Sequence, residues 1–201
     1  MKRLGIRSLA RRKKYNFKKG SEHKIFPNIL NRNFQSNKPF EKIATDITHL
    51  NYKGKKYYLA CFLDLFNKEI LEWNVQDKED NYLILEPMKR LLKKKRMNTV
   101  SPLVLHSDQG SQYSSLSFTN LLEQYNVTQS MSRAGNPRDN AVMESFFGWF
   151  KHILKYDFNY YYANDLRKTI EKAIDFYNKE RPSFALNYKT PVQYRIEQGF
   201  I

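Results

Sequence analysis

Cysteine is almost absent from this chain of 201 residues. The single Cys61 cannot form a disulfide within the chain, and no pair of cysteines is available for a zinc site. Cys61 lies in the apolar run Tyr57–Leu63, where a small buried side chain is expected. The four histidines are scattered along the sequence: His23, His49, His106 and His152. The composition therefore excludes a disulfide-stapled domain and makes zinc chemistry a poor explanation.

Long hydrophobic runs are also lacking. No apolar stretch approaches the roughly 18 residues that cross a membrane. The basic first residues are not followed by the apolar segment of a signal peptide. With 41% hydrophobic residues, the chain can still bury a core of one large or two small domains. We expect a cytoplasmic protein with no membrane partner.

Acidic residues are outnumbered. The chain has 35 Lys and Arg against 20 Asp and Glu, a net charge of +15. Such an excess favours a polyanionic partner, DNA first, although solubility alone would also explain it. The excess is largest in residues 1–38, which hold one acid, Glu22. We predict a basic N-terminal arm there, which contacts the DNA backbone or remains a solvated tail. Its candidate contacts are Arg11, Arg12, Lys13 and Lys14.

Hydrophobic periodicity predicts an α/β fold. Strands are expected over 43–50, 56–64, 69–75, 103–106 and 127–131. Helices are expected over 81–96, 117–125, 137–155 and 163–179, with one more capped turn over 190–194. Three consecutive strands form an antiparallel meander, and the later crossovers add parallel strands. The prediction is a mixed five-stranded sheet with helices on both faces.

Three acids stand where this topology could gather them. Asp46 lies within the first strand, Asp108 follows the fourth strand directly, and Glu144 lies on the helix after the fifth strand, about two turns from its start. Each acid alone has an ordinary structural explanation. Asp64, at the end of the second strand, is a reserve candidate. Asp139 sits in the first turn of a helix, where the helix dipole explains a carboxylate.

Clustered carboxylates repel one another, and a divalent cation removes that repulsion. Oxygen-only ligands suit Mg²⁺ or Mn²⁺. Two such ions support phosphodiester displacement by activating a nucleophile and stabilising the leaving oxygen. Together with the positive charge, the three acids therefore predict phosphoryl transfer on DNA with two Mg²⁺ or Mn²⁺ ions.

Five motifs resemble the integrase core of bacterial insertion-sequence transposases of the OrfB type, within the retroviral-integrase superfamily. They are "ATDITHL", "CFLDLFNKEILEW", "LHSDQGSQY", "SRAGNPRDNAVMESFFGWFK" and "ERPSFALNYKTPVQY". The resemblance covers about residues 30–197. It implies an RNase H-like fold and a catalytic, metal-binding triad that maps onto Asp46, Asp108 and Glu144. It also implies that Lys151, seven residues after the glutamate, contacts DNA at the element's end.

The implied reaction is strand cleavage by water followed by transfer of a 3′-hydroxyl to target DNA. The resemblance further implies a catalytic core over 39–180, a C-terminal tail over 181–201 packed on it, and a homo-multimer on DNA. The arm would be the end of a helix-turn-helix-like segment, about Lys2–Tyr15. We therefore expect that selection of element ends depends on a segment this chain lacks, and an upstream-frame protein is a possible partner.

Residues around the triad receive smaller roles. Arg138, Gln112 and Tyr113 are candidate DNA contacts. The aromatic residues of the third helix, Phe146, Trp149 and Phe150, are expected in the core rather than as base-stacking platforms. Phe26, Pro27, Ile29 and Leu30 are candidates to dock the arm on the body. The run Lys93–Arg96 is interpreted as a solvated helix end.

Two departures from the family pattern concern the C-terminal motif, where Ser183 and Asn187 replace the usual His and Gly. They affect the expected packing of the tail and leave the triad intact. Three other functions stay open at this point. They are a nuclease on the same fold, a truncated DNA-binding remnant or regulator without activity, and a basic scaffold protein.

Overall fold

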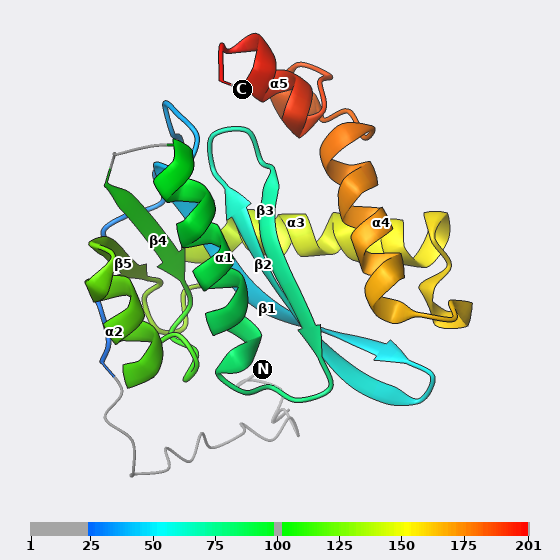
Figure 1. The fold of residues 1–201 in the computed structure, drawn as a ribbon, viewed down its shortest axis with the longest axis horizontal. Helices are drawn as coiled ribbons and strands as arrows, with labels where there is room; N and C mark the ends of the chain where they lie inside the picture. The colour runs from blue at the N-terminus through cyan, green and yellow to red at the C-terminus, as the bar shows by residue number, and fades with distance from the viewer. Residues whose placement is uncertain (1–23, 99–101, 201) are drawn as a thin grey trace, which may run out of the picture.

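The computed structural model describes residues 24–98 and 102–200, which fold around one mixed sheet (Figure 1). The strands are β1 (Lys42–Tyr52), β2 (Lys55–Asp64), β3 (Ile70–Gln76), β4 (Leu103–Ser107) and β5 (Val127–Met131). Their order across the sheet is β3-β2-β1-β4-β5. β1 to β3 pair antiparallel, whereas β4 runs parallel to β1 and β5 parallel to β4. The predicted fold class is confirmed.

Helices cover both faces of the sheet (Figure 1). They are α1 (Tyr82–Asn98), α2 (Leu116–Gln124), α3 (Ala141–His152), α4 (Leu166–Lys179) and α5 (Pro191–Glu197). Within β2, Ala60 and Phe62 belong to the core beneath α1 and α2, and the alternate residues Leu59, Cys61 and Leu63 belong to the core beneath α3 and α4. This alternation follows from the two-residue period of a strand. It explains why β2 reads as an unbroken apolar run.

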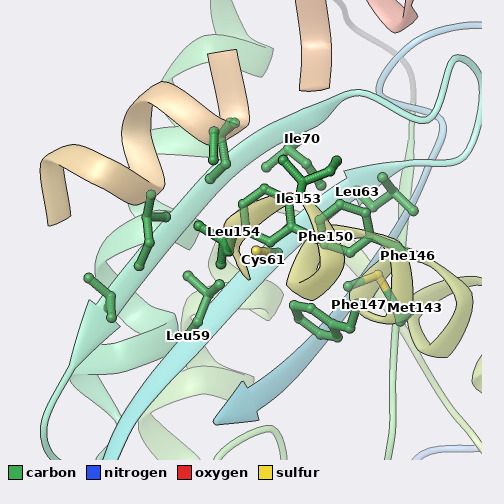
Figure 2. Close-up of a cluster of buried hydrophobic side chains, with 14 of the residues drawn as sticks. Leu59, Cys61, Leu63, Ile70, Met143, Phe146, Phe147, Phe150, Ile153 and Leu154 are labelled. Carbon is green, nitrogen blue, oxygen red and sulfur yellow. The ribbon is translucent and has the colours of Figure 1, made fainter. Parts of the chain in front are cut away.

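The helix α3 lies against the sheet through one apolar stripe. Met143, Phe147 and Phe150 point from it towards Cys61 and Leu63 of β2 (Figure 2). A π-helical turn, Ile153–Asp157, continues the helix and keeps Ile153 and Leu154 in the same core. The packing fixes the rotation of α3, and therefore which residues its outer side presents.

Two helix boundaries differ from the prediction. Residues 137–140 form a 3₁₀ turn, and α3 begins at Ala141 rather than at Pro137. Glu144 is therefore in the first turn of α3, not two turns in. Helix α4 begins at Leu166 instead of residue 163, because the Asp165 side chain accepts a hydrogen bond from the Lys168 N–H at 3.1 Å and caps it there. α1 continues through Pro87, and the Tyr82 N–H donates to the Asp80 carboxylate.

The tail after α4 packs on the turn between β2 and β3. The Asn67 amide donates to the Pro191 carbonyl at 3.0 Å, and Arg195 pairs with Glu69 at 3.0 Å. Thr190 and Gln193 form a reciprocal capping box at the start of α5. Within residues 24–98 and 102–200, no helix combines the length and apolar character that a bilayer crossing requires.

Asp64 is buried at the end of β2, where it forms hydrogen bonds to the segment before β1 and to the turn after β2. Its carboxylate accepts hydrogen bonds from the N–H groups of Phe40 at 2.8 Å and Phe66 at 2.9 Å. Burial raises the pKa of Asp64 to about 6, although these two hydrogen bonds oppose the rise. The residue held in reserve as a metal ligand is therefore a structural one.

This carboxyl group predicts a pH dependence of stability. In the folded protein it binds protons more tightly than in the unfolded chain, so its contribution to the unfolding free energy should fall as pH rises from about 4 to about 6. The change should be about 2–3 kcal/mol. Chemical denaturation at a series of pH values will measure it. Asp64→Asn should remove this slope while other acids keep theirs, and an unchanged slope would contradict the assignment.

Candidate active site

The sheet places Asp46 and Asp108 side by side. In the parallel pairing of β1 with β4, Ala44 lies opposite His106. Asp46 comes two residues after Ala44, and Asp108 comes two residues after His106. Because the two strands run in the same direction, both acids lie beyond this pair on the same side of it. Asp46 remains in β1 because it also pairs with Cys61 of β2, whereas Asp108 stands just past the end of β4. The two carboxylates are therefore neighbours by register.

Electrostatics confirm this proximity. The pKa of Asp46 is raised to about 7, first by burial and then by the negative charge of Asp108. The Ile47 N–H lowers it by donating to the Asp46 carboxylate at 2.8 Å, Glu144 raises it, and Lys151 lowers it. The Asp46 carboxylate thus interacts electrostatically with both other acids of the predicted triad and with the predicted DNA-binding lysine. The structure brings these four side chains to one region.

Asp108 begins a tight turn that needs glycine two residues later. Its Oδ1 accepts a hydrogen bond from the Gly110 N–H at 2.9 Å. A Cβ on residue 110 would lie 2.9 Å from that same oxygen, so any larger residue would push the carboxylate away. The glycine is explained by this close approach to Asp108.

Tyr113 lies inside the protein, so the prediction that it contacts DNA is wrong. Its side chain is only 1% exposed, and its hydroxyl lies 3.1 Å from the Thr45 Oγ1. Burial, followed by the charges of Asp46 and Asp108, raises the pKa of Tyr113 well above its usual range. Tyr113 joins the turn after Asp108 to the residue before Asp46. This buried contact helps to fix the positions of Asp46 and Asp108.

Glu144 and Lys151 are presented by α3. Glu144 is exposed in the first turn, and Lys151 is half-buried in the last turn. Residues seven apart lie on the same side of a helix. Burial lowers the pKa of Lys151, and the nearby Asp46 carboxylate opposes that shift. α3 therefore turns an acid and a base towards Asp46.

The donor set fits a hard divalent cation. In the described part of the chain, no three His, Cys, Asp or Glu side chains are already grouped tightly enough to hold an ion. One oxygen of Asp46 and one of Asp108 accept hydrogen bonds from nearby backbone N–H groups. The other oxygen of each, and both oxygens of Glu144, accept none from the described residues. These oxygens are available to a Mg²⁺-type ion, which relieves the repulsion that raises the Asp46 pKa.

A second cluster, which sequence reasoning missed, holds the loop before α3. The fully buried Asp139 carboxylate accepts from the Arg133 Nε at 2.7 Å and Nη2 at 2.8 Å. It also accepts from the Arg32 Nε at 2.9 Å and the Asn28 Nδ2 at 3.0 Å. Arg133 is the main cause that holds the pKa of Asp139 well below its usual range. Asp139 therefore serves these hydrogen bonds rather than the helix dipole. The local sequence could not predict them, because Arg32 lies 107 positions before Asp139.

His106 links that loop to the sheet. It is buried, its Nδ1 lies 2.9 Å from the Ser130 Oγ, and its Nε2 lies 2.8 Å from the Asp139 carbonyl oxygen. The Ser130 Oγ also accepts from the N–H groups of Ile29 and Leu30, so its hydroxyl donates to Nδ1 and the histidine donates from Nε2. Burial lowers the pKa of His106, which suits this neutral form. The residue is structural.

The remaining candidates are spread around this centre. Arg138 is exposed on the turn before α3, and Gln112 is half-buried beyond Asp108. Trp149 is 57% exposed, which corrects its placement in the core, whereas Phe146 and Phe150 are buried as expected. The arm residues Arg11, Arg12, Lys13 and Lys14 lie outside the described residues.

Family models and curated proteins resemble this chain over most of its length. Two models described as "Integrase core domain" match residues 36–137 and 125–191. The InsK protein of Escherichia coli, assigned as a transposase for insertion sequence element IS150, is 34% identical over 96% of this chain and 67% of its own length. A transposase-like protein of Haemophilus influenzae is 36% identical over 98% of this chain and 90% of its own length.

Solved structures share the fold. A chain of the simian T-cell lymphotropic virus intasome, solved in complex with PP2A regulatory subunit B56 gamma, superposes with a TM-score of 0.71 at 18% identity, over 88% of this chain and 60% of that one. The HTLV-2 integrase catalytic core domain, solved in complex with magnesium, gives a TM-score of 0.63 at 22% identity, over 79% of this chain and 98% of that one. At these identities the likeness concerns the fold.

Proposed function

The chain belongs to the integrase core domain family, as an insertion-sequence transposase, and on that premise we propose that it cleaves and joins DNA strands with divalent metal ions. The observation that carries the proposal is the convergence of Asp46, Asp108 and Glu144, with Lys151 beside them. Separate structural roles for the three acids do not explain why they share one region.

Asp46, Asp108 and Glu144 would hold two Mg²⁺ or Mn²⁺ ions. When bound, such ions activate the attacking oxygen and stabilise the leaving oxygen of a phosphodiester. In the first reaction, water breaks a P–O bond and releases a 3′-hydroxyl at the element's end. In the second, that 3′-oxygen forms a bond to a target phosphorus, and the bond to the target's own 3′-oxygen breaks. The chain's part is to position the phosphates and carboxylates.

Two basic residues would hold DNA. Lys151, on the same side of α3 as Glu144, would contact a phosphate of the element's end. Arg138 is exposed on the turn that leads into α3 and would contact the backbone beside it. The buried Tyr113–Thr45 contact and the Asp139 cluster would keep the acids in register. Synapsis of two ends would require a multimer.

A strand-transfer assay tests the proposal. A duplex with a precut 3′ end, derived from the ends of the element that encodes this chain, is incubated with a labelled target in Mg²⁺, Mn²⁺ or Ca²⁺. Joined products should form with Mg²⁺ or Mn²⁺. Hydrolysis without joining would instead identify a nuclease on this fold. DNA binding with no reaction in any metal would favour the inactive remnant and contradict the proposal.

Charge removal tests the orientation of α3. Lys151→Gln should weaken binding to duplex DNA and make the slope of log affinity against log salt less steep by about one unit. Lys94→Gln is the matched control. Lys94 lies near the end of α1 and already pairs with Glu72 at 2.7 Å. Filter binding across a salt series measures both, and equal effects would show that α3 does not face DNA.

A further inference from the structure

A groove runs beside α3, on the side that faces away from Glu144. It has a volume of about 560 Å³ and lies between α3, the end of α4 and the segment that follows α4. Ser145 and Trp149 of α3 line one wall, and Arg181 and Phe184 line the other. With 100° of rotation per residue, Trp149 points about 140° away from Glu144 around α3. The groove therefore lies on a different side of α3 from Glu144 and is separate from the acid site.

Two large aromatic side chains that line this groove are exposed, and a third exposed ring packs against one of them. Trp149 is 57% exposed and Phe184 79% exposed, and the ring of Tyr188, 72% exposed, packs edge-on against Phe184 with the centroids 5.5 Å apart. Several large apolar side chains exposed in one place are typical of a binding site. Aromatic residues that served only the core would have turned inward.

The loop after α4 holds these rings outward. Leu186 is buried and anchors the loop, while Phe184 and Tyr188 on either side point away. A bridge between Ser183 and Lys189 closes the loop, and the Tyr188 N–H donates to the Ser183 carbonyl at 2.9 Å. Tyr188 has a φ of 61°, a left-handed conformation that is costly for a tyrosine. The aromatic surface is therefore built by the backbone and does not depend on a side-chain rotation.

The charge of the groove selects an anion. Lys68 and Arg181 line it, and no aspartate or glutamate is among its described lining residues. The Arg181 guanidinium lies over the Trp149 ring, 5.1 Å from its centre, and pairs with no carboxylate in the described part of the chain. Lys68 donates to the Leu65 carbonyl at 2.6 Å and lies near the Asp64 carboxylate, so Arg181 is the cation that is left to contact an anion.

We propose that this groove binds unpaired DNA nucleotides, with Trp149 and Phe184 stacking on bases and Arg181 contacting a phosphate. Flat rings beside cations are the combination that recognises single strands, because the bases of a duplex are already stacked on one another. The inference rests on the proposed function only in taking DNA as the ligand. It adds a site for a single-stranded segment on a side of α3 away from Glu144.

Binding in the absence of metal tests this site. The full chain is titrated in EDTA against a labelled oligo-dT of about 12 nucleotides and against a duplex of equal length. Trp149→Ala should weaken binding to oligo-dT about tenfold, as expected for one lost stacking contact. Its effect on duplex binding should be below about twofold. Trp149→Phe keeps a ring and should retain most of the affinity.

Matched controls come from the other face of the sheet. Tyr82, on α1, is 63% exposed and lies outside the groove, so Tyr82→Ala should leave binding to oligo-dT unchanged. Circular dichroism and thermal melts check that each variant folds. Equal losses for Trp149→Ala and Tyr82→Ala, or equal losses on single strand and duplex, would overturn the proposal. A change in self-association without a change in oligo-dT binding would make the groove a protein interface and also overturn it.

The outcomes separate this site from the catalytic proposal. Asp108→Asn should keep binding to oligo-dT, because the groove does not include the acids. If strand transfer fails in every metal while Trp149-dependent binding persists, the catalytic proposal falls and the groove stands. If strand transfer occurs and Trp149→Ala binds oligo-dT normally, the reverse holds.

Discussion

Replacement of Asp108 by asparagine is expected to lower the rate of metal-dependent strand transfer by about a thousandfold or more, equivalent to roughly 4 kcal/mol in the barrier. Asparagine keeps the shape of the side chain and an oxygen that can still accept from the Gly110 N–H. It lacks the negative charge that a divalent cation needs as a ligand. The loss should therefore fall on chemistry and leave folding intact.

The same substitution should stabilise the protein when no divalent ion is present. Asp108 is one of the causes that raise the pKa of Asp46, so removing its charge relieves a repulsion between like charges. Thermal melts in EDTA and in Mg²⁺ will measure this. Wild type should gain stability from Mg²⁺ and Asp108→Asn should gain much less. Glu123→Gln, an exposed acid on α2, should behave as wild type. A variant at position 108 that retains a tenth of the activity would remove Asp108 from the metal site.

Asp139→Ala should have the second largest effect, a loss of about 10- to 100-fold in the rate of strand transfer, the size expected when reacting groups are displaced by about 1 Å. The Asp139 carboxylate joins Arg133, Arg32 and Asn28 to the turn that leads into α3. Without it, the loop before Glu144 loses its fixed position, and the arginines lose their buried partner. A lower melting temperature should accompany the loss.

Graded variants distinguish positioning from general damage. Arg32→Ala should cost less than Arg133→Ala, because the Arg133 guanidinium donates two hydrogen bonds to Asp139 and the Arg32 guanidinium donates one. If the loop only positions Glu144, Asp139→Asn should reduce the transfer rate while duplex affinity at low salt stays within about twofold. Wild-type rates in Asp139→Ala would show that the cluster has no part in the reaction.

The sheet could be predicted because its signals are local. β5 was predicted with the observed limits, Val127–Met131, and the limits of the other strands differ by one or two residues. The alternation of apolar and polar residues and the turn residues depend on only a few neighbouring positions, so they can be recognised in the sequence alone. The neighbouring placement of Asp46 and Asp108 followed from strand order, because β4 lies beside β1 and ends next to the part of β1 that holds Asp46.

What could not be predicted depends on contacts between distant segments. Tyr113 looked like a polar rim residue, yet it is buried because its hydroxyl finds Thr45, 68 positions earlier. Trp149 occupies a helical position next to core residues, but the outward side of α3 is decided by packing against β2. Pro137 is compatible with the first turn of an α-helix and equally with a 3₁₀ turn. Only the surrounding structure decides that it lies in a 3₁₀ turn.

The stretch from Pro27 to Arg32 has a mechanical consequence. It is fastened twice, by hydrogen bonds to Ser130 and Met131 at the edge of the sheet and by Arg32 to Asp139. Because both attachments lie within a few residues of one another, a shift of this stretch would move the edge of the sheet and the Asp139 loop together. The edge strand β5 and the support of Glu144 are therefore mechanically coupled through this short segment.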